Sequence, residues 1–187
     1  NNASSPTINM NISYMYGWNL IGLPLEIEDS NYQILFPESS EGTLYSYNGE
    51  QYLLEEELQM GNGYWLRFDN EGVSELFGLP VNQITIPLLH GWNLFSGIST
   101  DVDVDNIIDE EGIIVPNTIY GFTDFYFLPN FIEAGKGYWV YSLDDGYITL
   151  TTDTTQYLSK SITFNDKTDK GNSLQFTNSK GHTVNLY

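Results

Sequence analysis

The sequence predicts an all-β protein built from two homologous units, and three observations support this. The phrase GWNLIGLPL at residues 17–25 returns as GWNLFSGIS at 91–99. A second phrase, GNGYWL at 61–66, returns at the same offset of 74 residues as GKGYWV at 135–140. Between these phrases, short apolar runs are separated by turn signals about every 8 to 12 residues, which is typical of a sandwich or a barrel.

Each unit is expected to run from its GWNL strand through a variable acidic loop and an aromatic strand to its GYW strand. In the middle of the units, GTLYSYNGEQY at 42–52 matches NTIYGFTDFY at 117–126. Two copies in one register indicate a duplication and a pseudo-twofold pair of β units packed as one sandwich-like or barrel-like body. Two copies are too few for a solenoid. We place the first unit at residues 1–87 and the second at 88–157.

The remaining elements of the body follow from local pattern. VNQITIPLL at 81–89 and YITLTT at 147–152 are expected to be the strands that close the two units. The acidic stretches at 54–58 and 104–109 are the most helix-like segments, so we expect a helical turn in the loop of each unit.

The C-terminal segment, residues 158–187, differs in character from the body. It carries most of the lysines, whereas Arg67 and Lys136 are the only basic residues before position 150. ITF and SLQFT alternate in polarity, and SKG is a plausible turn into HTVNLY. We therefore expect a further strand and a β-hairpin.

Charge and composition exclude several classes of function. The 187 residues carry a net charge of −19. This argues against nucleic acid and anionic membranes as partners, because both need a basic surface. No apolar run reaches the ~18 residues that a membrane span needs. Cysteine is absent, so the core forms without disulfides or thiolate metal sites.

No constellation of catalytic residues stands out. Neither His90 nor His182 lies in a metal-binding spacing, and no G-x-S-x-G motif is present. The G-x-G before each YW pair precedes a strand rather than a helix, so it is not a phosphate cradle. With 25 acidic residues, some pair of carboxylates at glycosidase spacing is expected by chance. We therefore do not expect an enzyme.

The segment DVDVDNIIDEEG at 101–112 is the most metal-like stretch. Asp101, Asp103, Asp105 and Asp109 occupy positions 1, 3, 5 and 9 of a calcium loop. However, Asn106 stands where such a loop requires glycine, and Gly112 stands where it requires a bidentate glutamate. A solvated acidic loop is the simpler interpretation, and calcium is the only cofactor that the sequence suggests.

Aromatic residues are the richest feature, with 14 Tyr, 10 Phe and 4 Trp. Exposed aromatic rings form platforms on which sugar rings stack. All four tryptophans lie inside the recurring phrases, where a place in the core is the simpler expectation. The better candidates for a sugar platform are the loop aromatics with neighbouring polar side chains: Tyr47, Asn48, Tyr52, Phe122, Asp124, Phe125 and Tyr126.

The phrases GWNLIGLPL, GNGYWLRF, GWNLFSGIS, GIIVPNTIYGF and EAGKGYWVYS together resemble a known module. It is a repeat found near the C-termini of large secreted proteins of Bacteroidota-like bacteria, where it precedes a type IX secretion sorting domain. SLQFTNSKGHTVNLY is similar to the first hairpin of that sorting domain. The resemblance implies an extracellular or cell-surface location and an accessory role, and it assigns no catalytic residue.

We therefore predict a non-catalytic accessory module of a secreted or surface multidomain protein, binding polysaccharide through its loop aromatics. One alternative is a structural spacer or surface-assembly domain without a small ligand. Another is a calcium-stabilised adhesin-type module. The expected partners are polysaccharide, other domains of the same parent protein and further copies of the chain. Neither nucleic acid binding nor membrane insertion is expected.

Overall fold

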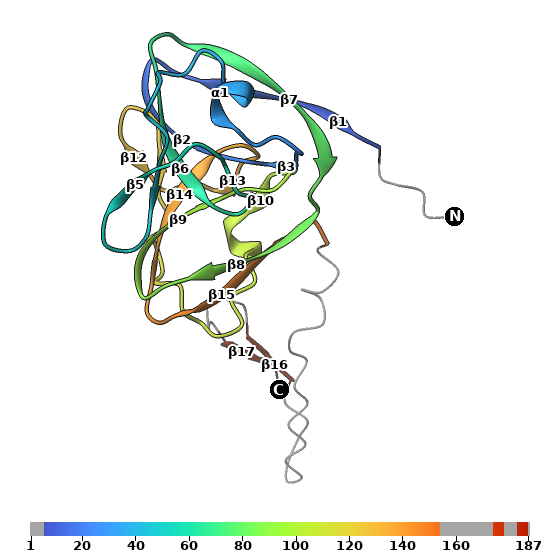
Figure 1. Ribbon diagram of the computed structural model, residues 1–187. Coiled ribbons are helices and arrows are strands. Elements are labelled where there is room, and N and C mark those ends of the chain that lie inside the picture. Colours follow the sequence, from blue (N-terminus) through green and yellow to red (C-terminus); the bar gives the residue numbers. More distant parts are fainter. Residues whose placement is uncertain (1–5, 154–173, 178–182, 187) are drawn as a thin grey trace. The chain divides into compact units, whose positions relative to one another are not determined.

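The computed structural model describes residues 6–153, 174–177 and 183–186 (Figure 1). The chain divides into two compact units, Asn1–Thr152 and Asp153–Tyr187. The described residues form antiparallel strands, loops, one short α-helix and one short 3-10 helix, which confirms the prediction of an all-β fold. None of the helices in these described ranges is long and apolar enough to cross a membrane.

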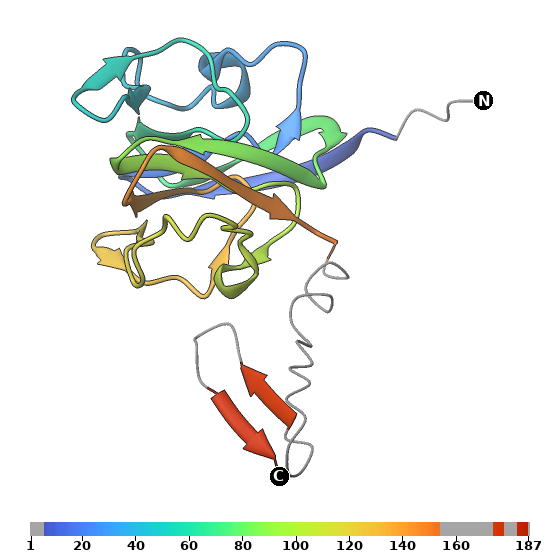
Figure 2. The same ribbon diagram turned by 90° about the horizontal axis from the view of Figure 1, so that it is seen from below.

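The larger unit has a first half and a second half, which lie on opposite sides of the body in Figure 2. The first half contains, in order, β1 (Ile8–Tyr14), β2 (Gly17–Gly22), β3 (Leu25–Glu26), α1 (Tyr32–Leu35), β4 (Tyr45–Tyr47), β5 (Tyr52–Leu54), β6 (Gly63–Phe68) and β7 (Gly72–Pro80). The second half contains, in order, β8 (Gln83–Leu88), β9 (Gly91–Ser96), β10 (Val102–Asp103), the 3-10 helix η1 (Val104–Asn106), β11 (Gly121–Phe122), β12 (Tyr126–Phe127), β13 (Phe131–Ile132), β14 (Gly137–Ser142) and β15 (Gly146–Thr151).

The two halves pair their strands in the same way. In each half the GWNL strand lies antiparallel to the GYW strand, which pairs β2 with β6 and β9 with β14. The first and last strands of each half also form an antiparallel pair, β1 with β7 and β8 with β15. The short β4–β5 and β11–β12 ribbons carry the aromatic segments, and β4 also pairs with β6.

This pairing corrects the boundary that the sequence suggested between residues 87 and 88. β8 pairs with β15, so it opens the second half instead of closing the first, and the suggested boundary falls inside it. The strand that closes the first half is β7, which the sequence pattern did not reveal. Its buried face carries Ser74 and Gly78, whereas Val73 and Phe77 face the solvent, so the usual apolar-inside alternation is partly inverted.

The helix-like segment predicted at 54–58 is wrong. Leu54 ends β5, and the backbone N–H of Glu55 donates to the carbonyl of Leu44 at 2.9 Å, so strand pairing wins over the local helical pattern. The helix of this half is α1, whose first turn is capped by the Asn31 side chain. In the second half, the turn predicted at 104–109 is present in part as η1, which Asp103 caps.

Each half has its own hydrophobic core. The first core is built around Leu66 and Phe68, with the Tyr14 ring stacked on Phe68 at a centroid distance of 3.7 Å. The second is built around Phe95 and Val140. A smaller third cluster contains side chains from both halves, and the groove described below lies over it.

The halves meet through close backbone contacts that recur at the offset of 74 residues. The backbone N–H of Gly22 donates to the carbonyl of Gly135 at 3.1 Å, and that of Ser96 donates to the carbonyl of Gly61 at 3.0 Å. At the ends of β6 and β14, a side chain in place of glycine would strike the backbone of the other half. Glycine is therefore required there by close approach.

In the smaller unit, β16 (Leu174–Thr177) and β17 (Thr183–Leu186) form an antiparallel hairpin, as the sequence predicted. The ITF segment at 162–164, the SKG turn at 179–181 and most of the predicted segment 158–187 lie outside the described residues.

Candidate ligand groove

The groove lies on one face of the GWNL and GYW strands. Because side chains alternate across a strand, Ile21 and Phe95 enter the two cores, whereas Leu20 and Leu94 point to the opposite face. Leu20 and Leu94 are buried there with Trp139. These three side chains form an apolar floor to which both halves contribute.

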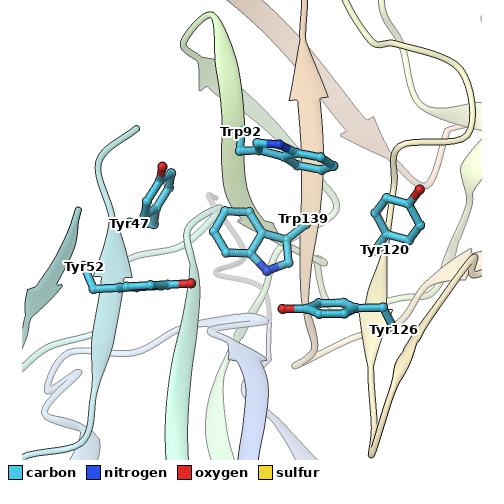
Figure 3. Close-up of a pocket in the computed structure, with 6 residues that line it drawn as sticks. All are labelled: Tyr47, Tyr52, Trp92, Tyr120, Tyr126 and Trp139. Carbon is cyan, nitrogen blue, oxygen red and sulfur yellow. The ribbon is translucent and has the colours of Figure 1, made fainter. Parts of the chain in front are cut away.

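The first pocket of the groove has a volume of about 520 Å³, and every residue that lines it is aromatic. Its walls are Tyr47, Tyr52, Trp92, Tyr120, Tyr126 and Trp139. Tyr47 and Tyr52 come from the β4–β5 ribbon of the first half, and the other four come from the second half. Figure 3 shows the other five rings arranged around Trp139.

The second pocket is of similar size, about 460 Å³, and it is also lined by aromatic residues. Its walls are Trp18, Tyr45, Tyr52, Trp65 and Phe122. Here four residues come from the first half and Phe122 comes from the second. Tyr52 lines both pockets, so the two adjoin each other.

The rings are held by edge-to-face and tilted contacts, which aromatic pairs prefer over face-to-face sandwiches. Trp92 and Trp139 meet at a centroid distance of 6.2 Å and an interplanar angle of 88°. Tyr47 meets Trp139 at 5.1 Å and 71°. Each ring thus supports its neighbour, and because these ring planes stand at steep angles to one another, the rings do not form one flat strip.

The rings at the rim are exposed, whereas the floor is buried. Tyr52 and Tyr126 are 52% and 53% exposed, and Trp18 and Trp92 are 42% and 37% exposed. Trp139 is only 8% exposed. The expectation that all four tryptophans belong to the core is therefore wrong for Trp18 and Trp92, because within residues 6–153 no further layer covers these two rings.

Polar atoms point into the first pocket. In Figure 3 the hydroxyls of Tyr52 and Tyr126 point toward each other from opposite walls, and the indole nitrogen of Trp139 points toward the space between them. Burial raises the pKa of the Tyr52 phenol, an effect that its interaction with the Trp65 side chain opposes. The phenol is therefore neutral at physiological pH, and it can both donate and accept a hydrogen bond.

The structure brings together four of the predicted platform residues, Tyr47, Tyr52, Phe122 and Tyr126, as walls of the two pockets. The remaining predicted platform residues do not line the pockets. Phe125 is 68% exposed beside them. The Asn48 side chain accepts from the backbone N–H groups of Glu50 and Gln51, so its carbonyl oxygen shapes the turn. Asp124 is exposed in the turn between β11 and β12.

Sequence reasoning missed the other pocket residues, which are Trp18, Tyr45, Trp65, Trp92, Tyr120 and Trp139. A signal for them was present, because each is aromatic in both copies of the sequence, at an offset of 74 or 75 residues. Core packing explains recurrent aromatics equally well, so recurrence alone did not separate the two roles.

The carboxylates of the acidic segment 101–112 do not converge on one point. Asp101 accepts from the backbone N–H of Ala134 at 3.0 Å, and Asp103 caps η1. The Asp109 carboxylate accepts from the N–H groups of Ile113 and Ile114, both at 2.9 Å. Within the described ranges, no group of three or more His, Cys, Asp or Glu side chains is arranged to hold a metal ion. The predicted calcium site of Asp101, Asp103, Asp105 and Asp109 finds no support in this geometry.

Comparisons of the chain with protein-family models, with curated proteins and with solved structures find no match. The assignment of a function therefore depends on the chemistry of the groove.

Proposed function

We propose that the protein is a non-catalytic module that binds a neutral glycan in its aromatic groove. The observation that carries this proposal is the pair of adjoining pockets with wholly aromatic linings and exposed tyrosine and tryptophan rings at the rim. Each pocket lies within the range of about 300 to 1,000 Å³ that is usual for small-ligand sites.

The chemistry of the lining favours sugars. Pyranose rings present patches of C–H bonds that stack on aromatic faces, and their hydroxyls both donate and accept hydrogen bonds. The neutral hydroxyls of Tyr52 and Tyr126 and the indole N–H of Trp139 match that mixed character. A proline-rich peptide also stacks on aromatic rings, but prolines offer only carbonyl acceptors and would leave the acceptor capacity of the phenols unused.

Charge favours a neutral ligand. The net charge of −19 repels polyanions, and among the described residues no charged side chain lines either pocket to attract one. The same lining supports binding over hydrolysis, because the described part of the chain places no carboxylate in either pocket to act as general acid or nucleophile. We place the module in a secreted or cell-surface protein on the strength of its sequence resemblance alone.

Affinity electrophoresis in gels that contain neutral plant and algal polysaccharides tests this function. We expect slower migration of the full chain in at least one gel, and loss of that retardation in Tyr52→Ala, which removes a wall of both pockets. Phe125→Ala is the matched control, since it deletes an exposed aromatic ring outside both linings. Unretarded migration in every gel, or binding of a proline-rich peptide instead, would refute the proposal.

A surface-assembly role is the second candidate. β1 lies at the edge of its sheet, and next to it β7 exposes Val73 and Phe77, which are 59% and 61% exposed. An edge strand with apolar neighbours can accept a strand from another copy. Light scattering distinguishes this role, because assembly predicts a mass that rises with concentration and falls to that of a monomer in Phe77→Lys.

A further inference from the structure

The two halves exchange equivalent contacts. Gly22 of the first half bonds to Gly135 of the second, and Ser96 of the second bonds to Gly61 of the first. The Tyr64 hydroxyl accepts from the backbone N–H of Gln59 in one half, and the Tyr138 hydroxyl accepts from that of Glu133 in the other, both at 2.9 Å. Reciprocal contacts of this kind characterise a twofold relation, in which the same surface is presented from both sides.

The two pockets are counterparts under this relation. Trp18, Tyr45 and Trp65 in one pocket correspond in sequence to Trp92, Tyr120 and Trp139 in the other. Each pocket also contains rings from the opposite half, two in the first pocket (Tyr47 and Tyr52) and one in the second (Phe122). Tyr47 packs on Trp139 at 5.1 Å, and its counterpart Phe122 packs on Trp65 at 4.9 Å.

The pockets are also continuous. Tyr52 lines both, and its ring contacts Tyr47 at 5.4 Å and Trp139 at 6.4 Å within the first pocket. A ligand that leaves one pocket past Tyr52 therefore enters the other. Neither pocket is complete without a residue from the opposite half, so the groove is a property of the joined halves.

From this geometry we infer that the pockets are two subsites of one groove, which bind successive units of a single glycan chain through the faces of their rings. This inference depends on the proposed function. A glycan chain has a direction, from its reducing end to its non-reducing end. Because a twofold relation connects the two subsites, one chain that crosses both runs through them in opposite directions. Hydrogen bonds to particular hydroxyls depend on that direction, whereas stacking on a ring face does not. The groove therefore selects flat pyranoses with equatorial hydroxyls, such as β-linked glucose or xylose, and accepts the chain either way round.

Two linked subsites predict that affinity depends on chain length. A short ligand fills one subsite at a time, whereas a longer one fills the second intramolecularly at an effective concentration in the millimolar range. We expect the affinity of a hexasaccharide to exceed that of a disaccharide by about 10- to 100-fold.

Isothermal titration of the full chain with β-1,4-linked gluco-oligosaccharides and xylo-oligosaccharides, from disaccharide to hexasaccharide, tests this inference. Trp18→Ala and Trp92→Ala each damage the rim of one subsite, so each variant is expected to keep disaccharide binding and lose most of the gain with length. Tyr52→Ala is expected to lower the affinity for both the disaccharide and the hexasaccharide, and Phe125→Ala is expected to change neither affinity. Circular dichroism confirms that every variant is folded.

The possible failures are distinguishable. If the wild type binds oligosaccharides of all lengths equally, or if only one of the two tryptophan variants has an effect, the two-subsite groove is refuted while the glycan-binding function stands. If the wild type binds neither the oligosaccharides nor any polysaccharide, both proposals fail.

Discussion

The contact between the halves depends on two glycines, and replacing either with alanine tests the architecture directly. An alanine Cβ at Gly137 would lie 2.8 Å from the carbonyl oxygen of Ile21, and one at Gly63 would lie 2.6 Å from that of Phe95. Both obstacles are backbone atoms of a paired strand, so neither can swing aside. We expect Gly137→Ala and Gly63→Ala to destabilise the protein, and Gly63→Ala the more strongly.

The magnitude follows from these distances. A carbon atom and a carbonyl oxygen settle at about 3.3 to 3.6 Å, so the two strands must separate by about 0.5 to 1 Å at the substituted position. Overpacking of this kind costs about 1 to 3 kcal/mol, and the less flexible unfolded chain of the alanine variant offsets about 0.4 to 1 kcal/mol. The net loss of about 1 to 2 kcal/mol corresponds to a fall in Tm of about 2 to 8 °C for a protein of this size.

Thermal unfolding of the full chain, followed by near-ultraviolet circular dichroism, measures this loss. Ser96→Ala is the control at the same junction. Among the described residues, the Ser96 hydroxyl is buried without a hydrogen-bond partner, so its removal is expected to be neutral or to raise Tm. If both glycine variants melt within 1 °C of the wild type, the close approach of the halves is wrong.

Three further predictions concern pH, metal ions and the acidic loop. Burial raises the pKa of Tyr138, so the folded state favours the neutral phenol. The stability that this contributes is complete below the unfolded pKa of about 10 and is lost as pH rises above it. Tm should therefore fall between pH 9 and 11, and it should fall less steeply in Tyr138→Phe. Burial lowers the pKa of Lys136, which contributes in the opposite direction and is kept in this variant. Parallel curves of Tm against pH for the two proteins would contradict this. Neither EDTA nor added calcium should change Tm. A rise of several degrees in Tm with calcium would instead support the predicted calcium loop. Asp109→Ala should lower stability by about 1 to 3 kcal/mol in denaturant titrations, because it leaves two backbone N–H groups without their acceptor; an unchanged midpoint would contradict that role.

The fold class and the GWNL and GYW strands were predictable because both depend on local pattern. β2 and β6 alternate as the sequence indicated, with Leu66 and Phe68 turned into the core. Strand β7 was not predictable in this way, because small residues, Ser74 and Gly78, occupy buried positions. At Gly78 a side chain would strike the backbone carbonyl oxygen of Glu26 in β3. The pairing of β8 with β15 joins residues more than 50 positions apart, and no local pattern encodes it.

The site was predictable only in part, for a related reason. Tyr52 and Tyr126 begin the short strands β5 and β12, in segments that the sequence predicted to be loops, where large aromatic side chains point to a role outside the core. Trp18 and Trp92 lie in strands, where the same side chain fits a core equally well. Which face of a strand is covered depends on the packing of the two halves, and that packing leaves the outer face of β2 and β9 open.

The division between exposed rim and buried floor also determines which variants can test binding. Trp139 is part of the floor, is almost fully buried and supports Tyr47, Tyr52 and Trp92, so Trp139→Ala is expected to cost about 3 to 5 kcal/mol of stability. A loss of binding in that variant would not identify a ligand contact, because the whole pocket would relax. Trp92 keeps more than a third of its surface exposed, so Trp92→Ala is expected to lower stability by about 1 to 2 kcal/mol and the affinity for a hexasaccharide by about tenfold or more. Equal losses of stability in Trp92→Ala and Trp139→Ala would mean that the rim is part of the core, and the open groove would then be wrong.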